Sequence, residues 1–191
     1  MVDSSQFEHD NQTYAPVVWP TTLRILFAAT AWHSWTIRQL DFVVAFLNGQ
    51  LRDTVYMRQP AGFEQGEKGK LVCRLNQALY GLDPAARIWY DTMTATLRSI
   101  GFKPCPYDPG LFVHEDRRHL YLSSHVDDCM VVAEDPANAE WVISTLSQRF
   151  ELKDMGQISH YLGTDVEFRD NGIRVHQTQY AQEVVQSFGQ E

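Results

Sequence analysis

The spacing of apolar residues near the start of the chain predicts a helix followed by a strand. Residues 20–35 contain side chains at helical spacing that would form one packed face, namely Leu23, Leu26, Phe27 and Thr30. Thr21 or Thr22 is a suitable N-cap for this helix. Residues 36–42 instead alternate with a period of two, which is typical of a strand. This alternation places Asp41 on the more polar face of the strand.

Turn residues and further periodic segments predict that helices and strands continue to alternate. Asp83 and Pro84 mark the start of a helix, and Gly101 marks its end. Asp135 and Pro136 mark another helix start. The expected ranges are a helical turn at 45–51, strands at 55–58 and 71–75, a helix at 83–101, strands at 110–114, 119–125 and 129–133, a helix at 135–150, a hairpin of 158–168 with 172–177, and a helix at 178–188.

The order of these elements predicts an α+β fold, with helices packed on one face of an antiparallel sheet. A chain of 191 residues and 22.0 kDa suffices for one sizeable core but hardly for two large domains. Residues 1–13 have few apolar anchors, and we expect them to lie loosely on the surface.

Composition and charge narrow the class of protein. No run approaches the roughly 20 apolar residues of a membrane span, and no signal peptide opens the chain. We therefore expect an intracellular protein without a membrane partner. Cys73, Cys105 and Cys129 form no CxxC pair, which argues against a zinc site or a disulfide framework. The net charge of −8 is unusual for a nucleic-acid binder, because such proteins are usually basic.

The stretch HVDDCMVV places two adjacent carboxylates, Asp127 and Asp128, at the tip of an expected hairpin. A solvated Asp-Asp turn is the common interpretation of this dipeptide taken alone. Adjacent central strands would also bring Asp41 close to Asp127, and converging carboxylates repel one another unless a divalent cation neutralises them. Oxygen ligands of this kind suit Mg²⁺, and two such ions are the basis of nucleotidyl transfer. The residues alone leave both interpretations open.

Six stretches in a fixed order carry a more specific signal. They are YAPVVWPTTLRILFAATA, QLDFVVAFLNGQLRDTVYMRQPAGF, VCRLNQALYGLDPAARIWY, GFKPCPYDPGLF, HVDDCMVVA and FELKDMGQISHYLGTDVEF. Together they closely resemble the reverse transcriptase of copia-type LTR retrotransposons, whose motifs include Q-x-D-x-x-x-A-F-L-N-G and Y-V-D-D. The resemblance runs from about residue 12 to the C-terminus. A single motif would be ambiguous, whereas all of them in the family's order are very specific.

The resemblance implies a palm-type, reverse transcriptase-like sheet with an active site of three aspartates. Asp41, Asp127 and Asp128 would be the catalytic residues and would hold two Mg²⁺ or Mn²⁺ ions when substrate is bound. The other implied residues are Phe42, Phe46, Tyr80 and Gly81 for nucleotide binding and Leu162 and Gly163 for the primer grip.

For Phe46 and Gly163, a purely structural role is an alternative to the role that the resemblance implies. Phe46 would exclude a ribose 2′-hydroxyl and favour deoxynucleotides, but a buried core phenylalanine is equally expected from the residue type alone. Gly163 would belong to the hairpin that grips the primer end, but a tight bend explains a lone glycine there as well.

The resemblance also implies a function, partners and a domain layout. The function would be that of an RNA-directed DNA polymerase acting on a primed RNA or DNA template with deoxynucleoside triphosphates. The rest of a Gag-Pol polyprotein would be a further partner, in cytoplasmic virus-like particles or in the nucleus. The palm with partial fingers would cover residues 14–176, and residues 177–191 would form a C-terminal helix at a possible start of the thumb.

Departures from the family's motifs keep a second function open. His125 replaces the usual Tyr before Val-Asp-Asp. Asp83 and Pro84 replace Lys-Gln, and Ala86 replaces Pro, so a positive charge near the pocket has become negative. The sequence also starts after the family's basic fingers strands, so we expect little processive synthesis from this chain alone. The alternative function is a truncated or domesticated relic that binds a metal or a partner without polymerising.

Overall fold

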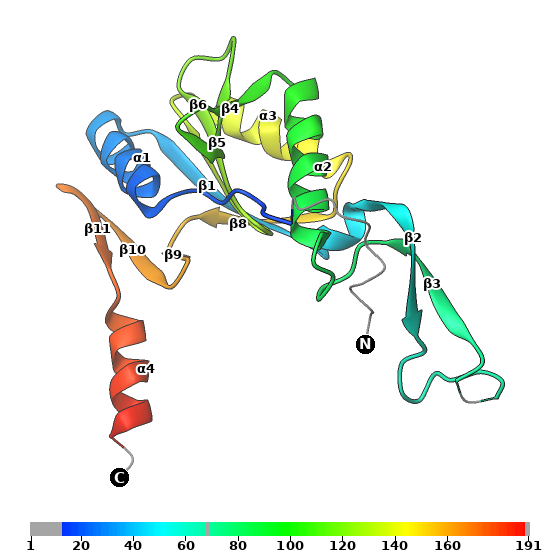
Figure 1. The fold of residues 1–191 in the computed structure, drawn as a ribbon. Coiled ribbons are helices and arrows are strands. Elements are labelled where there is room, and N and C mark those ends of the chain that lie inside the picture. Colours follow the sequence, from blue (N-terminus) through cyan, green and yellow to red (C-terminus); the bar gives the residue numbers. More distant parts are fainter. Residues whose placement is uncertain (1–12, 68, 190–191) are drawn as a thin grey trace.

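Helices and strands alternate along residues 13–67 and 69–189, which are the residues that this computed structural model describes (Figure 1). The helices are α1 (Pro20–His33), the short 3-10 helix η2 (Ala45–Asn48), α2 (Ala85–Ser99), α3 (Pro136–Ser147) and α4 (Thr178–Phe188). The strands are β1 (Thr36–Phe42), β2 (Gln50–Arg58), β3 (Val72–Gln77), β4 (Phe102–Cys105), β5 (Asp108–His114), β6 (Leu120–His125), β7 (Asp128–Ala133), β8 (Leu152–Gln157), β9 (His160–Tyr161), β10 (Thr164–Arg169) and β11 (Gly172–His176). The expected α+β class is confirmed. Residues 1–12 of the segment predicted to be loose lie outside the described residues.

A six-stranded antiparallel sheet forms the centre of the fold, in the order β4-β5-β6-β7-β1-β8. β7 and β1 are interior strands, so both are paired along their two edges. β9, β10 and β11 form a separate three-stranded sheet, and β2 pairs with β3. The ends of β1 and β7 are therefore held in a fixed register, and the candidate site lies at those ends.

Both faces of the six-stranded sheet are covered, because the residues of β7 alternate between two cores. Cys129 and Val131 pack in the core that contains residues of α2 and α3. Met130 and Val132 pack in a second core with α1, which includes Leu26. The expectation that the helices share one face is thus wrong for α1 (Figure 1). The continuous apolar run of β7 is typical of a strand that is buried on both faces.

Three aromatic rings fix the end of β1 in the first core. Phe42 contacts Trp89 of α2 and Phe150 with ring centroids 5.3 and 5.7 Å apart, and Trp89 lies 5.3 Å from Phe150. All three pairs are edge to face, which is a favourable arrangement of aromatic quadrupoles. Because side chains alternate along a strand, the burial of Phe42 directs its neighbour Asp41 to the other face.

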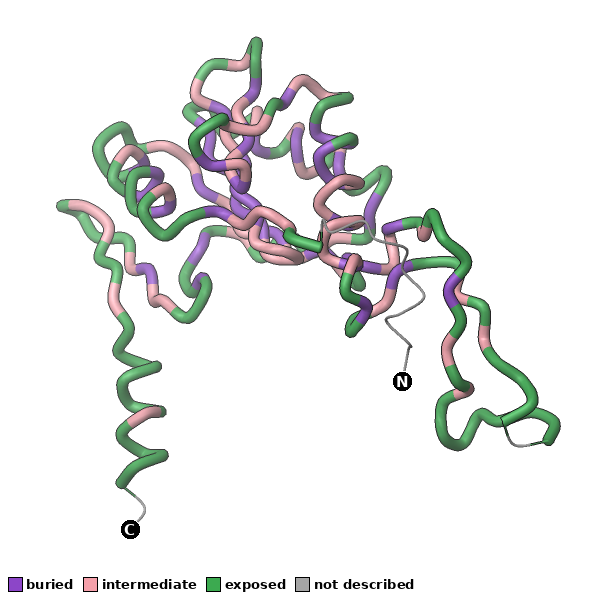
Figure 2. Tube along the Cα trace, viewed as in Figure 1, coloured by how far each residue is buried: buried purple, intermediate pink, exposed green. Residues whose placement is uncertain are grey.

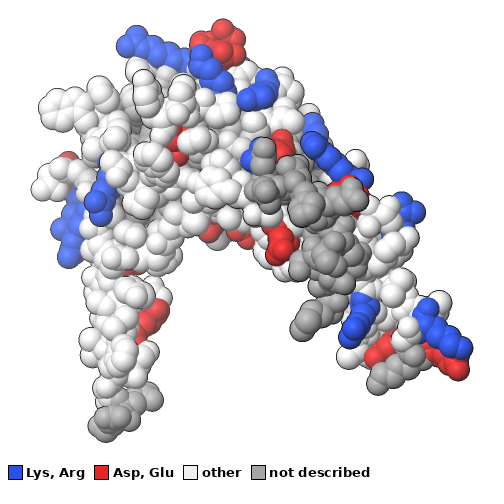
Figure 3. Space-filling view, in the orientation of Figure 1, with Lys and Arg blue, Asp and Glu red and all other residues white. Residues whose placement is uncertain are grey.

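Two segments project from this body. The β2–β3 hairpin and α4 extend away from the six-stranded sheet (Figure 1), and both are largely exposed (Figure 2). α4 has no buried residue in the structure. Lys and Arg side chains are scattered over the face seen in Figure 3 and form no continuous stripe there. No helix of the described residues has the length and apolar character to span a membrane.

The sequence pattern did not predict β4 and β8, which are the two edge strands of the six-stranded sheet. β4 contains Pro104 and β8 contains Gly156, and both residue types are unfavourable inside a strand. Proline is tolerated on an edge strand because one side of that strand needs no hydrogen-bond donor. The helix predicted from Asp83 begins instead at Ala85, with Pro84 as its N-cap residue.

Candidate active site

Three carboxylates lie at one end of the central strands. Asp41 is the direct Cα partner of Asp128 in the antiparallel pair of β1 and β7. Residues directly opposite each other in such a pair project to the same face of the sheet. Asp127 immediately precedes β7, and its backbone carbonyl accepts a hydrogen bond of 3.0 Å from the Phe42 N–H. The fold therefore brings the three predicted aspartates into one region.

The turn that carries Asp127 is strained locally and supported by hydrogen bonds. His125 and Asp128 are paired, so only Val126 and Asp127 connect β6 to β7. Val126 has φ +60°, which is rare for a β-branched residue. The Trp89 indole Nε1–H donates to the Val126 carbonyl at 2.7 Å. This bond from α2 helps to hold the turn in a conformation that Val126 would not favour alone.

The carboxylates affect one another electrostatically. Burial raises the pKa of Asp128, and the neighbouring charges of Asp127 and Asp41 raise it further. Lys153 is the Cα partner of Asp41 in β8, and its Nζ lies 3.9 Å from Asp41 Oδ2. This lysine is largely exposed and offsets only part of the negative charge.

The three aspartates fit an oxygen-preferring cation by their chemistry, although no metal site is formed among the residues that the structure describes. Across residues 13–67 and 69–189, no group of three or more His, Cys, Asp or Glu side chains is arranged to hold a metal ion. Asp41, Asp127 and Asp128 nevertheless offer only carboxylate oxygens, which are the ligands that Mg²⁺ prefers. Burial, together with the charges of Asp127 and Asp41, disfavours the ionised form of Asp128 and so raises its pKa.

Phe46 and Tyr80 form an aromatic pair beside Asp127. Their ring centroids are 4.2 Å apart, and the Tyr80 hydroxyl donates to Asp127 Oδ2 at 3.2 Å. Phe46 is only 8% exposed, whereas Tyr80 is 61% exposed. Burial raises the pKa of Tyr80, and the charge of Asp127 raises it further, so the hydroxyl keeps its proton. Gly81 follows with φ +90°, a conformation that favours glycine.

Phe42 is the predicted site residue that the fold separates most clearly from the others. Its side chain is 1% exposed and belongs to the core with Trp89 and Phe150. A contact between the Phe42 side chain and a nucleotide therefore has no support in the structure. Its backbone N–H instead positions the Asp127 turn.

Leu162 and Gly163 form the two-residue turn between β9 and β10. Tyr161 and Thr164 are paired on either side of the turn, and Leu162 and Gly163 have φ +49° and +71°. Positive φ at both central residues is typical of a tight hairpin turn, which accounts for Gly163 without a primer. The Tyr161 hydroxyl donates to the Asp128 carbonyl at 3.3 Å and thus links this hairpin to β7. The primer-grip role stays a prediction.

Sequence reasoning missed Lys153 and the contact between Tyr80 and Asp127. Lys153 lies in a polar stretch, ELKDMGQ, whose pattern does not indicate which residue faces Asp41. The register of β8 against β1 decides this. The resemblance predicts that Tyr80 lies in a nucleotide pocket, but its bond to a residue 47 positions away depends on the tertiary fold.

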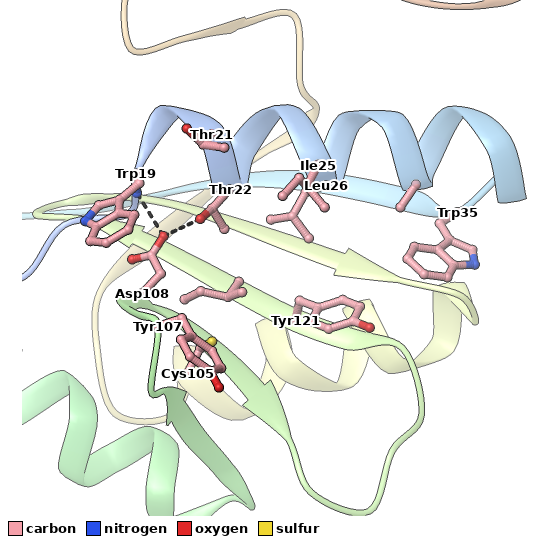
Figure 4. A pocket seen from close by; sticks show the side chains of 12 residues that line it. Trp19, Thr21, Thr22, Ile25, Leu26, Trp35, Cys105, Tyr107, Asp108 and Tyr121 are labelled. Carbon is pink, nitrogen blue, oxygen red and sulfur yellow. Dashed lines mark hydrogen bonds between the residues drawn. The ribbon is translucent and has the colours of Figure 1, made fainter.

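A separate apolar pocket lies between α1 and β5 (Figure 4). It has a volume of about 420 Å³ and contains none of the predicted site residues. Its carboxylate, Asp108, accepts hydrogen bonds from the Trp19 N–H at 3.0 Å, the Thr22 hydroxyl at 2.5 Å and the Gly110 N–H at 3.0 Å. Asp108 is therefore part of the framework that fixes the start of α1 on β5.

Comparison with known proteins establishes the class. The chain belongs to the reverse transcriptase (RNA-dependent DNA polymerase) family, whose model matches residues 2–190. This agrees with the antiparallel α+β fold.

Similar proteins within this family are Pol polyproteins of plant transposons. The chain is 38% identical over 170 residues to the retrovirus-related Pol polyprotein from transposon RE1 of Arabidopsis thaliana, which covers 88% of the chain and 12% of that protein. It is 31% identical over 182 residues to the corresponding polyprotein from transposon TNT 1-94 of Nicotiana tabacum, which covers 93% of the chain and 14% of that protein. The resemblance to copia-type retrotransposon reverse transcriptases is thereby confirmed. The chain spans only about an eighth of the length of these relatives.

Proposed function

We propose that this chain is the catalytic core of an RNA-directed DNA polymerase that carries out nucleotidyl transfer at Asp41, Asp127 and Asp128. The observation that carries the proposal is the pairing of Asp41 with Asp128 on adjacent strands, with Asp127 in the turn beside them. Three carboxylates at one end of a sheet repel each other and attract a divalent cation. Family membership supports the same reaction class.

The three aspartates would hold two Mg²⁺ or Mn²⁺ ions in this function. Such a pair of ions supplies charge stabilisation for both the attacking and the leaving oxygens of an in-line phosphoryl transfer. The protein contributes rigid placement of the ligands. Asp41 and Asp128 are fixed by the β1–β7 register, and the Asp127 backbone is held by the Phe42 N–H. Lys153 beside Asp41 would offer a positive charge to a phosphate group.

The aromatic pair of Phe46 and Tyr80 would form the wall against which the sugar of an incoming nucleotide rests. Phe46 is fixed by burial, and Tyr80 covers it from the solvent side. A rigid ring at this position would leave no space for a 2′-hydroxyl and would favour deoxynucleoside triphosphates. Gly81 would let the backbone approach the nucleotide closely, and Leu162 with Gly163 would contact the primer end. The template and the rest of a Pol polyprotein would complete the assembly inside the cell.

A non-catalytic module is the second candidate for the function of this chain, and the negative charge of the chain favours it. Asp83 stands where the family has a lysine, and the net charge of the chain is −8. Both features oppose the binding of a triphosphate and of a template. A domesticated relic would keep the fold and perform a metal- or partner-binding role without polymerising.

Primer extension tests the proposal. The chain is incubated with poly(rA)/oligo(dT), deoxythymidine triphosphate and Mn²⁺ at low salt, in parallel with the Asp127→Asn variant. We expect only weak, non-processive extension by the wild type, in keeping with the little processive synthesis expected from this chain alone, and a loss of about a hundredfold or more in the variant, since a metal ligand is removed. Asp170→Asn is the matched control, because Asp170 is exposed in the turn between β10 and β11.

Three results would contradict the proposal in different ways. Equal extension by the wild type and Asp127→Asn would mean that the aspartate set is wrong. Equal losses in Asp127→Asn and Asp170→Asn would point to a general charge effect. No extension by the wild type, together with no heat of Mn²⁺ binding, would favour the non-catalytic module.

A further inference from the structure

The hydrogen bond between Tyr80 and Asp127 joins two parts of the site that are distant in the sequence. Tyr80 lies in the connection between β3 and α2, and Asp127 lies in the turn between β6 and β7. The Tyr80 hydroxyl donates to Asp127 Oδ2 at 3.2 Å. A residue of the proposed nucleotide pocket therefore contacts a proposed metal ligand directly.

The position of the Tyr80 ring is restrained although the ring is exposed. It lies against the buried Phe46 with ring centroids 4.2 Å apart. The connection itself is held by Ala78, whose N–H donates to the Gly49 carbonyl at 3.0 Å. Ala78 and Leu82 are both buried on either side of Tyr80. The hydroxyl is thus presented to Asp127 by an anchored segment.

A donor that holds one carboxylate oxygen limits the rotation of the whole group. Asp127 lies in a two-residue turn and is only partly buried, so packing alone leaves its side chain considerable freedom. Groups that hydrogen-bond to metal ligands orient them, and the removal of such a group commonly weakens metal binding by about 10- to 100-fold. The Tyr80 hydroxyl occupies this position relative to Asp127.

We propose that Tyr80 is a positioning residue whose hydroxyl orients the Asp127 carboxylate for a divalent cation. The inference rests on the proposed function, because it takes Asp127 to be a metal ligand. It also links the two halves of the site: a nucleotide that moves the Tyr80 ring would change cation affinity, and by thermodynamic reciprocity the cation would change nucleotide affinity by the same factor.

A calorimetric titration of the full chain with Mn²⁺ alone tests this inference, because it measures cation affinity and needs no enzymatic activity. Tyr80→Phe removes the hydroxyl and keeps the ring on Phe46. We expect roughly tenfold weaker Mn²⁺ binding in this variant, with an unchanged thermal unfolding midpoint because Tyr80 is exposed. Tyr121→Phe is the matched control, since its hydroxyl contacts His119 Nδ1 at 3.3 Å and lies outside the site.

The possible outcomes separate this inference from the proposed function. Weaker binding only in Tyr80→Phe supports the positioning role. Equal Mn²⁺ affinity of Tyr80→Phe and the wild type would overturn the role of Tyr80 while leaving the metal site intact. Tighter binding would overturn it as well, because the hydroxyl would then compete with the cation. No Mn²⁺ binding by the wild type would overturn the metal site itself and this inference with it.

Discussion

Asp41 and Asp128 lie directly opposite each other in adjacent antiparallel strands, with their side chains on the same face of the sheet. This pairing is unfavourable for folding, since like charges at directly opposed positions destabilise a sheet. Both strands are interior, so their register cannot shift without exposing two cores. The fold therefore holds two like charges opposite each other, and the divalent cation of the proposed function would neutralise them.

The first prediction concerns this repulsion. Asp128→Asn keeps the shape of the side chain and removes one of the opposed charges, so the metal-free protein should become more stable by about 0.5 kcal/mol. Urea unfolding at pH 7 in the presence of a chelator measures this difference. A less stable variant would mean that the Asp128 charge is compensated in the folded protein.

The second prediction concerns Phe46. Because the ring is buried, Phe46→Ala should lower the free energy of unfolding by about 3 kcal/mol. If the ring also excludes a 2′-hydroxyl, the variant should incorporate ribonucleotides more readily relative to deoxynucleotides. Unfolding and primer extension with both nucleotide types measure the two effects separately. Lower stability with unchanged discrimination would identify Phe46 as a core residue only.

The third prediction concerns Lys153, which the fold places beside Asp41. Its Nζ is exposed and 3.9 Å from the carboxylate, so Lys153→Gln should hardly change stability. The loss of a charged contact to phosphate should raise the KM for the nucleotide about fivefold, which corresponds to roughly 1 kcal/mol. Lys103→Gln is the matched control, because Lys103 is also an exposed lysine beside a carboxylate. It lies on β4, with its Nζ 3.2 Å from Glu115 Oε1 and outside the candidate site. Equal KM values for both variants would show that Lys153 does not contact the substrate.

The fourth prediction concerns the indole of Trp89. Trp89→Phe keeps most of the packing but removes the Nε1–H bond to the Val126 carbonyl, so stability should fall by about 1–3 kcal/mol. Chemical denaturation measures this loss, and Trp32→Phe serves as the control because Trp32 is 84% exposed. A change below the experimental error in Trp89→Phe would mean that the turn holds its conformation without the indole.

The fifth prediction concerns pH. His114 Nδ1 accepts hydrogen bonds from the N–H groups of Asp116 and Arg117 at 3.1 and 3.0 Å, so the ring is neutral in the fold. Burial lowers the pKa of His114, and the Arg117 charge lowers it further. The unfolded chain then takes up a proton more readily than the folded chain, so stability should fall as the pH drops below about 6.5.

The measurement for His114 is the free energy of unfolding between pH 7.5 and about 5. His114→Gln should flatten this pH dependence, whereas His33→Gln should not, because His33 is exposed at the end of α1. Parallel curves for the wild type and His114→Gln would contradict the prediction.

Local sequence patterns were sufficient for much of the secondary structure. Helical spacing predicted α1 from Leu23, Leu26 and Phe27, which are all buried in the structure. The Asp135-Pro136 start of α3 is also confirmed, with the Asp135 carboxylate accepting from the Ala137 N–H at 2.9 Å. These features depend on residues only a few positions apart, so periodicity and capping residues reveal them.

Motifs identified the family and predicted the three aspartates as its site, but the sequence alone did not determine how the residues meet. The Tyr80–Asp127 bond, the position of Lys153 opposite Asp41 and the placement of α1 on the second face all depend on strand order and register. β4 and β8 contain Pro104 and Gly156, yet both are strands, because each pairs with the outer edge of a neighbouring strand, β4 with β5 and β8 with β1. Such contacts between distant segments form only when all strands of the sheet are hydrogen-bonded to their neighbours and both faces are buried. Strand pairing and burial depend on residues far apart in the sequence, so a local pattern does not reveal them.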